Sequence, residues 1–145
     1  MRYCRLLIPI APVLAFMIGQ SAAQEPSGNT VGVIPAASAA GVTGTRVLAV
    51  DNPIFMGDVV NTDGVGEVQI RFRDNTRIVV GPNSHMTIDR FVFNPDNTAS
   101  DVALNFVRGT FRFIGGVSDS EAYSFRTPAM TIGIRGSAFD ISIPD

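Results

Sequence analysis

The sequence lacks most of the side chains on which metal centres and nucleophilic catalysts are built. It has no tryptophan and no lysine, and only one cysteine and one histidine among 145 residues. Cys4 lies in a leader that we expect to be removed, so the mature chain is expected to have no disulfide, no thiol nucleophile and no cysteine metal ligand. His85 follows turn residues 81–84 and is expected at the surface, outside any Ser-His-Asp triad or zinc site.

Motifs that would indicate an enzyme are also missing. There is no Gly-x-Ser-x-Gly elbow, no phosphate-binding loop and no carboxylate pair typical of a glycosidase. Carboxylates that are close in sequence do not follow the spacing of a calcium loop, and beside glycine and proline such residues stabilise turns. These carboxylates are Asp51, Asp58, Asp63, Glu67 and Asp74. We therefore expect a protein that is not an enzyme and that has no metal and no cofactor.

The N-terminus has the order of a secretory signal peptide. Two arginines lie within the first five residues, residues 6–19 are uncharged and apolar, and Ser21, Ala22 and Ala23 supply small residues before Gln24. The alternative is an uncleaved anchor, but spanning a bilayer takes about 17–25 apolar residues, and this run is shorter and contains two prolines. We expect a signal peptide at residues 1–23 and an exported protein in the periplasm or at the cell surface, without a stable membrane anchor after cleavage.

Removal of this leader would leave nine arginines against thirteen acidic residues, a balance of −4. An acidic chain is a poor partner for nucleic acid or for an anionic membrane, so we expect neither. Several arginines are nevertheless expected to point outward from neighbouring strands. They form either a basic stripe for an anionic polymer or acidic partner, or a solvated face offset by carboxylates. The candidate binding residues are Arg71, Arg73, Arg77, Arg108 and Arg112.

Short segments of alternating polarity fill the chain from residue 45 onward, and turn residues separate them. None has the i, i+3, i+4 apolar spacing of a helix. The expected strands are residues 46–50, 65–73, 77–80, 85–93, 102–108, 110–114, 123–126, 130–134 and 138–143, after a first strand at 31–34. The sequence predicts an all-β, single domain at residues 31–145, with a flexible lead-in at 24–30 and a loop at 35–44. Both a β-sandwich and a stacked-hairpin β-roll satisfy the pattern.

The two central strands of this pattern also predict a register. Val68, Ile70 and Phe72 share a face, and an odd loop at residues 74–76 brings Ile78 and Val80 to that face, with Phe72 opposite Ile78. A two-residue turn would instead bring a charged side chain to the core. The predicted core comprises Val68, Ile70, Phe72, Ile78, Val80, Ile88, Leu104, Phe106, Phe111, Phe113, Phe125, Ile132, Ile134, Phe139 and Ile141.

The ordered motifs of the chain resemble those of the FecR-type domain. The closing signature of that family, T-P-x-A-x-x-x-x-R-G-T-x-F-x-V, is matched by Thr127, Pro128, Arg135, Gly136 and Phe139. Met130 replaces the usual Ala, Ser137 the usual Thr, and Ile141 the usual Val. Earlier matches are Gly57, Asp58, Thr62, Asp74 and Gly109, with Asn75 in place of the usual Gly. The resemblance extends over about residues 31–143.

The resemblance implies an exported, non-enzymatic module that binds an envelope protein or a surface polymer. In the membrane-bound regulators of this family, the exported domain receives a signal from an outer-membrane receptor of iron-siderophore uptake, so a periplasmic signalling component is the first alternative. Some of those regulators cleave themselves at a Gly-Thr bond, which makes autoproteolysis at Gly136-Ser137 the second, through attack of the Ser137 hydroxyl on the preceding carbonyl. The structural interpretation is that Gly136 bends the chain and Arg135 pairs with an acid such as Asp140.

Overall fold

The computed structural model describes residues 23–145, and these residues are nearly all in strands. The predicted signal peptide therefore lies outside the described residues, except for Ala23. One turn of 3-10 helix, η1 (Ser120–Ala122), interrupts the strands. The strands are β1 (Gly28–Ile34), β2 (Ala37–Gly41), β3 (Gly44–Val47), β4 (Pro53–Ile54), β5 (Val59–Thr62), β6 (Glu67–Phe72), β7 (Arg77–Val80), β8 (His85–Phe93), β9 (Ala99–Ile114), β10 (Tyr123–Arg126), β11 (Thr131–Gly133) and β12 (Ala138–Ile143).

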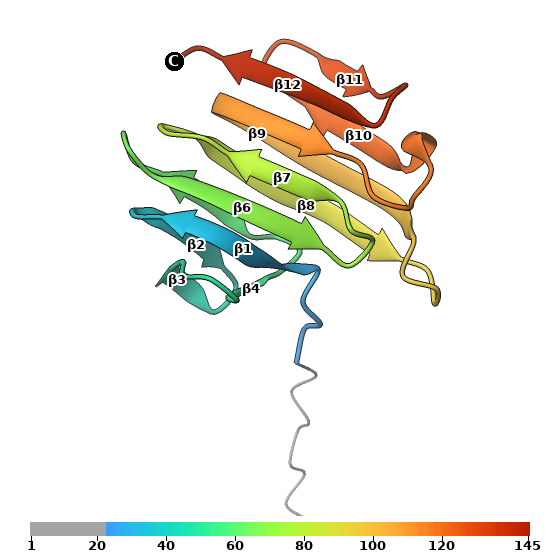
Figure 1. Cartoon of the computed structure of the whole chain (residues 1–145), viewed down its shortest axis with the longest axis horizontal. Helices are drawn as coiled ribbons and strands as arrows, with labels where there is room; N and C mark the ends of the chain where they lie inside the picture. Colours follow the sequence, from blue (N-terminus) through green and yellow to red (C-terminus); the bar gives the residue numbers. More distant parts are fainter. Residues whose placement is uncertain (1–22) are drawn as a thin grey trace, which may run out of the picture.

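The strands form one curled sheet, close to a half-barrel, that folds over into two layers (Figure 1). The front layer has the order β4-β1-β6-β7-β9-β12, and the back layer has the order β3-β2-β5-β8-β9-β10-β11. Strand β9 belongs to both layers, because residues 99–108 pair with β8 and residues 111–114 pair with β7. The all-β, single-domain prediction is confirmed, and the continuous sheet of bent hairpins corresponds to the roll.

Four of the places where the chain passes between the layers are bends that together form the corner of the roll. The bends lie between β1 and β2, β5 and β6, β7 and β8, and in the middle of β9. At the last of them Gly109 has a φ of +101°, and a Cβ at this position would overlap Ser84. The backbone can therefore turn this corner only with glycine at residue 109.

The core lies between the two layers and is rich in phenylalanine. Phe72 of the front layer stacks on Phe91 of the back layer, with ring centroids 4.2 Å apart. Phe106 and Phe111, on either side of the β9 bend, stack at 4.5 Å, and Phe113 meets the edge of Phe125 at 4.9 Å. These aromatic contacts join the layers across the whole width of the roll.

The β6–β7 hairpin has the expected odd loop but a different pairing. Val68, Ile70, Phe72, Ile78 and Val80 are all buried on one face, as predicted. Ile70, not Phe72, lies opposite Ile78, and Phe72 donates to the carbonyl of Thr76 instead. The three-residue loop is 73–75 rather than 74–76, because positive φ at Asn75 closes the turn one residue earlier.

The structure also corrects several predicted boundaries. Strand β2 occupies part of the predicted loop 35–44, and β1 begins at Gly28, within the predicted lead-in. Alanine-rich β2 was missed because its small side chains give little alternation. Strands β4 and β5 were not predicted, and the two strands expected at 102–108 and 110–114 are the single bent β9.

The C-terminal end of the roll, formed by β11, β12 and the segment between them, is less buried than the sequence predicts. Four residues assigned to the core are only half-buried, although they pack against it: Ile132, Ile134, Phe139 and Ile141. Periodicity alone cannot distinguish these positions from fully buried ones, since no further strand pairs with β12 among residues 23–145.

Candidate functional site

The outer face of the front layer brings together three of the five candidate arginines. Arg71 of β6 lies directly opposite Arg77 of β7, and Arg112 of β9 lies opposite Val79, diagonally from Arg77. All three side chains are exposed, as expected for the polar face of alternating strands. Three of the five candidate arginines are therefore neighbours on one exposed face, and we call them the arginine cluster.

A groove of about 640 Å³ crosses the same face beside this cluster. Its lining includes Gln69, Val79, Thr110, Arg112, Asp140 and Ser142, from strands β6, β7, β9 and β12. These side chains offer hydroxyl and amide groups around an apolar patch and one ion pair, and Glu67 adds a carboxylate that accepts from Gln69 and forms no ion pair among the described residues. Such a lining can receive hydrogen-bonding ligands along its length.

Arg112 and Asp140 form the ion pair in this groove. The Arg112 Nε and Nη2 atoms donate to the two carboxylate oxygens of Asp140 at 2.7 and 2.9 Å. The hydrogen bonds from Arg112 lower the pKa of Asp140, and the same contact raises the pKa of Arg112. The predicted pairing of Arg135 with Asp140 is wrong, because Asp140 pairs with Arg112 across the β9–β12 ladder.

Arg71 and Arg77 have no such partner among the described residues, where neither side chain forms an ion pair. On the neighbouring strands, Asn29 of β1 lies opposite Arg71, and Ile114 of β9 lies opposite Arg77. Two arginines therefore face each other with no carboxylate to separate them.

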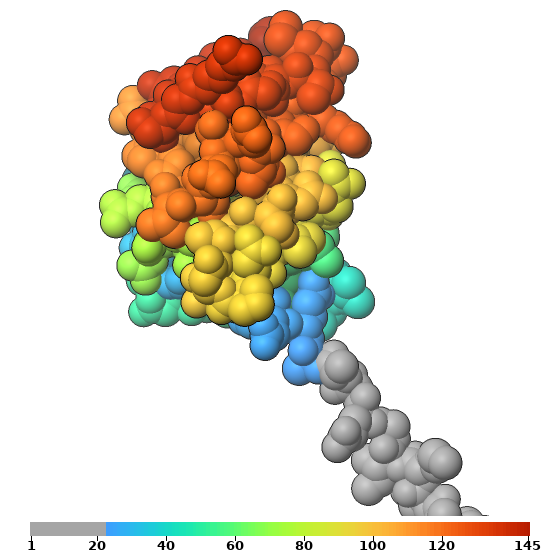
Figure 2. Space-filling view, turned by 90° about the vertical axis from the view of Figure 1, so that its right-hand side faces the viewer, coloured from blue at the N-terminus to red at the C-terminus, as the bar shows by residue number. Residues whose placement is uncertain are grey.

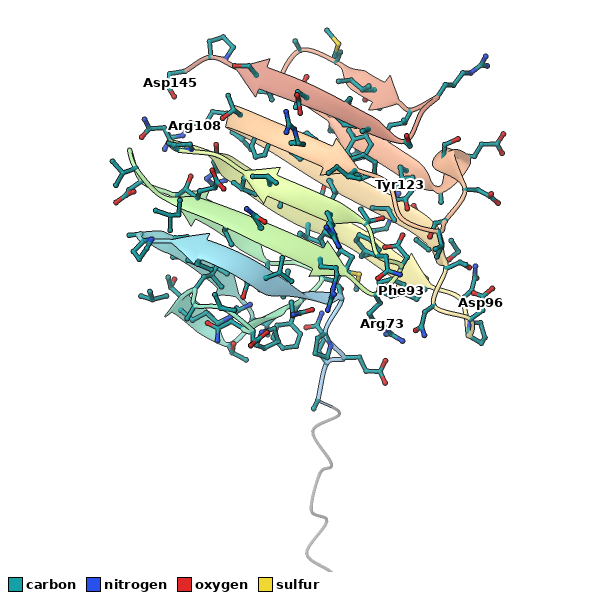
Figure 3. All side chains as sticks on the ribbon, viewed as in Figure 1. Arg73, Phe93, Asp96, Arg108, Tyr123 and Asp145 are labelled. Carbon is teal, nitrogen blue, oxygen red and sulfur yellow. The ribbon has the colours of Figure 1, made fainter. Side chains whose placement is uncertain are left out.

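The other two candidate arginines lie at opposite ends of the molecule (Figure 3). Arg73 leaves the stripe at the β6–β7 turn, where it lies 4.6 Å over the Phe93 ring and pairs with Glu25 at 3.1 Å. Arg108 is at the corner, 4.0 Å from Asp145. The sequence could not separate these two from the cluster, because the bend of β9 and the hairpin turn redirect both side chains.

The family-motif residues Gly57 and Asp58 form a structural turn. Gly57 has a φ of +89°, and the buried Asp58 carboxylate accepts hydrogen bonds from the Phe55 amide and the Arg46 guanidinium. Arg46 also lies 5.4 Å over the Phe55 ring. This anchor fastens β3 to the start of β5. Arg46 was not singled out in the sequence, although it is the arginine nearest to the Gly-Asp motif on the predicted preceding strand.

Thr62 and Gly109 hold the corner of the roll. Thr62 is buried, its hydroxyl donates to the Gly81 carbonyl at 2.6 Å, and it accepts from the Ser84 amide at 3.0 Å. Ser84 in turn accepts at its hydroxyl from the Thr110 amide at 3.1 Å, next to Gly109. These two motif positions are therefore explained by the backbone bends and not by ligand binding.

Asp74 is a fully buried carboxylate that forms no ion pair within residues 23–145. It accepts from the Thr76 amide and from three hydroxyls, those of Thr76, Ser118 and Tyr123, at 2.7–3.0 Å. Burial, followed by the hydrogen bond with Asp74, raises the pKa of Tyr123. The network ties the β6–β7 turn to the segment between β9 and β10, and its members 118 and 123 were not found from sequence because they lie more than 40 residues from Asp74.

The closing family signature lies at the exposed C-terminal end of the roll. The Thr127 hydroxyl accepts from the Met130 amide in the turn that contains Pro128. Arg135, Gly136 and Ser137 are all exposed between β11 and β12, and Gly136 has a φ of +153°. Phe139 packs at 5.3 Å on Phe113. Within residues 23–145 the Ser137 hydroxyl makes no hydrogen bond to a proton acceptor.

No helix in the described part of the chain is long and apolar enough to cross a lipid bilayer. A family model described as FecR protein matches residues 58–145. A solved structure described as a cell surface anchoring domain is 34% identical over 42% of this chain and 82% of its own, with a TM-score of 0.40. A search of curated proteins finds no match.

Proposed function

The chain belongs to the FecR protein family, and from that premise we propose that it is an exported, non-enzymatic interaction module of the bacterial cell envelope. It binds an envelope component, a protein or a surface polymer, through the outer face of the front layer. The observation that supports this most is the groove across β6, β7, β9 and β12, with the arginine cluster at its side. Both features are on one face, whereas the structural motif residues are at the corner, in turns and in the core.

Binding of envelope material to a groove variant tests this proposal. Gln69 is exposed in the groove, and Gln69→Trp would fill it without touching the core. Thr45→Trp is the matched control, since Thr45 is an exposed position on edge strand β3 of the back layer. Immobilised parent and Thr45→Trp should retain one component from an envelope extract, and Gln69→Trp should lose it. Equal retention by all three would contradict the proposal.

A periplasmic signalling component is the second candidate, and family membership supports it. In that case the retained component would be an outer-membrane receptor or a membrane-bound regulator. Identification of the retained material by mass spectrometry separates the two candidates, because a glycan or a structural envelope protein would contradict the signalling role.

Autoproteolysis at Gly136-Ser137 is the third candidate, and the surroundings of Ser137 give it less support. Attack on the preceding carbonyl needs a proton acceptor near the hydroxyl. The intact mass of freshly purified protein tests the cleavage directly. We expect a single full-length mature species for the parent and for Ser137→Ala. A parent fragment ending at Gly136 that disappears in Ser137→Ala would overturn this expectation.

A further inference from the structure

We infer that Arg71 and Arg77 form a two-arginine clamp for one oxyanion, a phosphate or carboxylate group on an acidic glycan that lies in the adjacent groove. This inference rests on the proposed function, because it names the chemistry that the front face would recognise. It assigns the two arginines a direct ligand contact and leaves the neighbouring Arg112 as part of the groove wall.

The register sets Arg71 and Arg77 directly opposite each other on the outer face. Phe72 donates to the Thr76 carbonyl, so the next pair inward, Arg71 and Arg77, occupies a non-hydrogen-bonded site of the ladder. At such sites the Cα atoms are about 4.5 Å apart, the shorter of the two spacings in an antiparallel pair. Two long side chains that start this close together can reach the two sides of a single anion.

The surroundings of the pair contain donors and neutral groups but no acid. The residues next to it on this face, across the ladder or two positions along a strand, are Asn29, Gln69, Arg73, Asn75, Val79 and Ile114. The nearest acidic residue along β6 is Glu67, whose Cα lies four residues or about 13 Å from that of Arg71 at strand spacing, and it forms no ion pair with Arg71.

Like charges directly opposite each other destabilise an antiparallel pair. Most arginines of the described chain form an ion pair with a carboxylate, which neutralises their charge locally. These are Arg46, Arg73, Arg90, Arg108 and Arg112. Arg126 and Arg135 also form no ion pair within residues 23–145, but Arg126 faces Asn105 and Thr131, and Arg135 lies outside the strands. The Arg71–Arg77 pair is thus the place where a bound oxyanion would remove a repulsion and also gain charge-assisted hydrogen bonds.

The groove favours a glycan over an acidic protein segment as the bearer of this anion. The groove starts at the neighbouring outward pair of the hairpin, Gln69 and Val79, and continues past the hydroxyls of Thr110 and Ser142, while the carboxylate of Glu67 lines it two residues beyond Gln69. Amide and hydroxyl groups beside a small apolar surface match the hydroxyls and ring faces of sugars. The acidic net charge of the chain makes long-range attraction of a polyanion weak, so recognition would depend on the short-range clamp and would weaken with salt.

Titration of defined anions into arginine variants tests the clamp. The probes are inorganic phosphate and polygalacturonate, at constant ionic strength, with NMR of the arginine Nε–H groups as the readout. Arg71→Gln and Arg77→Gln should each weaken phosphate binding at least about tenfold, since each removes a charged hydrogen bond. Arg126→Gln, an exposed arginine without an ion pair, should bind like the parent. Equal affinity in all four proteins would overturn the clamp.

Thermal stability gives a second, independent readout. Arg77→Glu converts the like-charge pair into an opposite-charge pair, so without ligand its Tm should rise above that of the parent while phosphate binding is lost. A lower Tm for this variant in buffer without phosphate, together with lost binding, would show that Arg77 supports the fold and would overturn the inference.

Two further comparisons distinguish failure of the clamp from failure of the proposed function, and show whether the oxyanion belongs to a glycan or to an acidic polypeptide. Gln69→Trp should lose polygalacturonate and envelope material but retain the phosphate response. If envelope binding depends on Gln69 but is unchanged in Arg77→Gln, the clamp is wrong and the proposed function stands. If phosphate binding follows the arginines but no protein retains envelope material, the proposed function fails. Binding of polyglutamate in place of polygalacturonate would overturn the assignment to a glycan.

Discussion

At the scale of single residues, the chain uses one turn sequence in two environments. Asp74-Asn75-Thr76 and Asp96-Asn97-Thr98 both end hairpins, and in each the aspartate accepts from the amide and hydroxyl of the threonine. Asn75 and Asn97 have nearly equal φ values of 64° and 63°. Asp96 is exposed at the tip of the β8–β9 hairpin, whereas Asp74 is fully buried beneath the segment that follows β9, which lies next to that hairpin in Figure 2. The local geometry is therefore the same and only the burial differs.

This pair predicts very different effects for the same substitution. Asp74→Ala would leave the hydroxyls of Thr76, Ser118 and Tyr123 without their shared acceptor, and should lower the free energy of unfolding by at least about 3 kcal/mol. Asp96→Ala removes the same local contacts in solvent and should cost about 0.5–1 kcal/mol. Denaturant unfolding of the two variants measures the difference. Similar losses would show that the turn itself, and not the buried network, is what Asp74 stabilises.

Tyr123 predicts a loss of stability at high pH. Its pKa is raised by burial and by Asp74, so the folded protein favours the neutral phenol. The contribution is complete below the ordinary value of 10.0 and is lost as the pH rises through the raised value. The chain has no lysine, and its other tyrosine and its cysteine, Tyr3 and Cys4, lie in the predicted leader, so Tyr123 is the one side chain of residues 24–145 expected to titrate in this range.

The measurement combines tyrosinate absorbance with unfolding in the same samples. For protein without the leader, the absorbance titration above pH 10 reports Tyr123 alone, and it should be displaced upward and coincide with loss of structure. Tyr123→Phe should be less stable at neutral pH but should lack the loss of stability that the parent shows as the pH rises above 10. A normal tyrosine titration without any change in stability would contradict this account.

At the scale of secondary structure elements, the bend of β9 decides the architecture. Residues 99–108 belong to the back layer and residues 111–114 to the front layer, so one strand joins both halves of the sheet. The bend needs a positive φ at Gly109, and the neighbouring Ser84 leaves no space for a side chain there. Gly57 also has a positive φ, but no atom lies within 4 Å of where its Cβ would be.

The two glycines therefore make a matched test of this bend. Gly57→Ala should cost about 1–3 kcal/mol, the strain of a non-glycine residue in this region of φ. Gly109→Ala carries the same strain and in addition displaces Ser84 and the Thr110 hydrogen bond, so its loss should be clearly larger. Thermal unfolding of both variants gives the comparison. Equal losses would show that the corner adapts to a side chain at residue 109.

At the scale of the whole molecule, burial decreases toward the C-terminal end of the roll, where β11 and β12 lie. Phe72, between β1 and β7, is 2% exposed, whereas the inward residues of β12 are only half-buried. Phe139 contacts the core through Phe113 and Phe125, at 5.3 and 5.1 Å. The end of the stack that contains the family signature is thus the end with the least packing above it.

This gradient predicts unequal effects for two phenylalanines that share the same strand pattern. Phe72→Ala should cost about 3–5 kcal/mol, as for a fully buried ring. Phe139→Ala should cost less, about 1–2 kcal/mol, because part of the ring is in contact with water already. Arg71→Ala, on the outer face, should cost nothing or raise stability slightly, since it relieves the repulsion with Arg77. Denaturant unfolding compares the three, and a larger loss for Phe139→Ala than for Phe72→Ala would mean that the C-terminal end of the roll is buried in solution.

The candidate site was predictable in its residue types and only partly in its arrangement. Alternation alone made Arg71, Arg77 and Arg112 outward-facing, and they are. The arrangement depends on a turn, a bend and a register. The turn and the bend move Arg73 and Arg108 away from the cluster. The register decides that Asp140 pairs with Arg112 and that Arg71 faces Arg77. None of these is a property of one strand. A hairpin register changes every cross-strand neighbour when its loop is shifted by a single residue.

The sequence by itself determined the fold class, the inward face of nearly every strand, the turns at Asp74 and Asp96 and the family, because period-two alternation and turn chemistry are local properties. The tertiary structure alone decided that β9 bends into both layers, that alanine-rich β2 is a strand, and that Asp74 is buried and accepts hydrogen bonds from residues 118 and 123 of a distant segment as well as from residue 76 of its own turn. It also decided which arginines meet. These features arise from packing between segments far apart in the chain, where burial and hydrogen bonding depend on neighbours that no local pattern specifies.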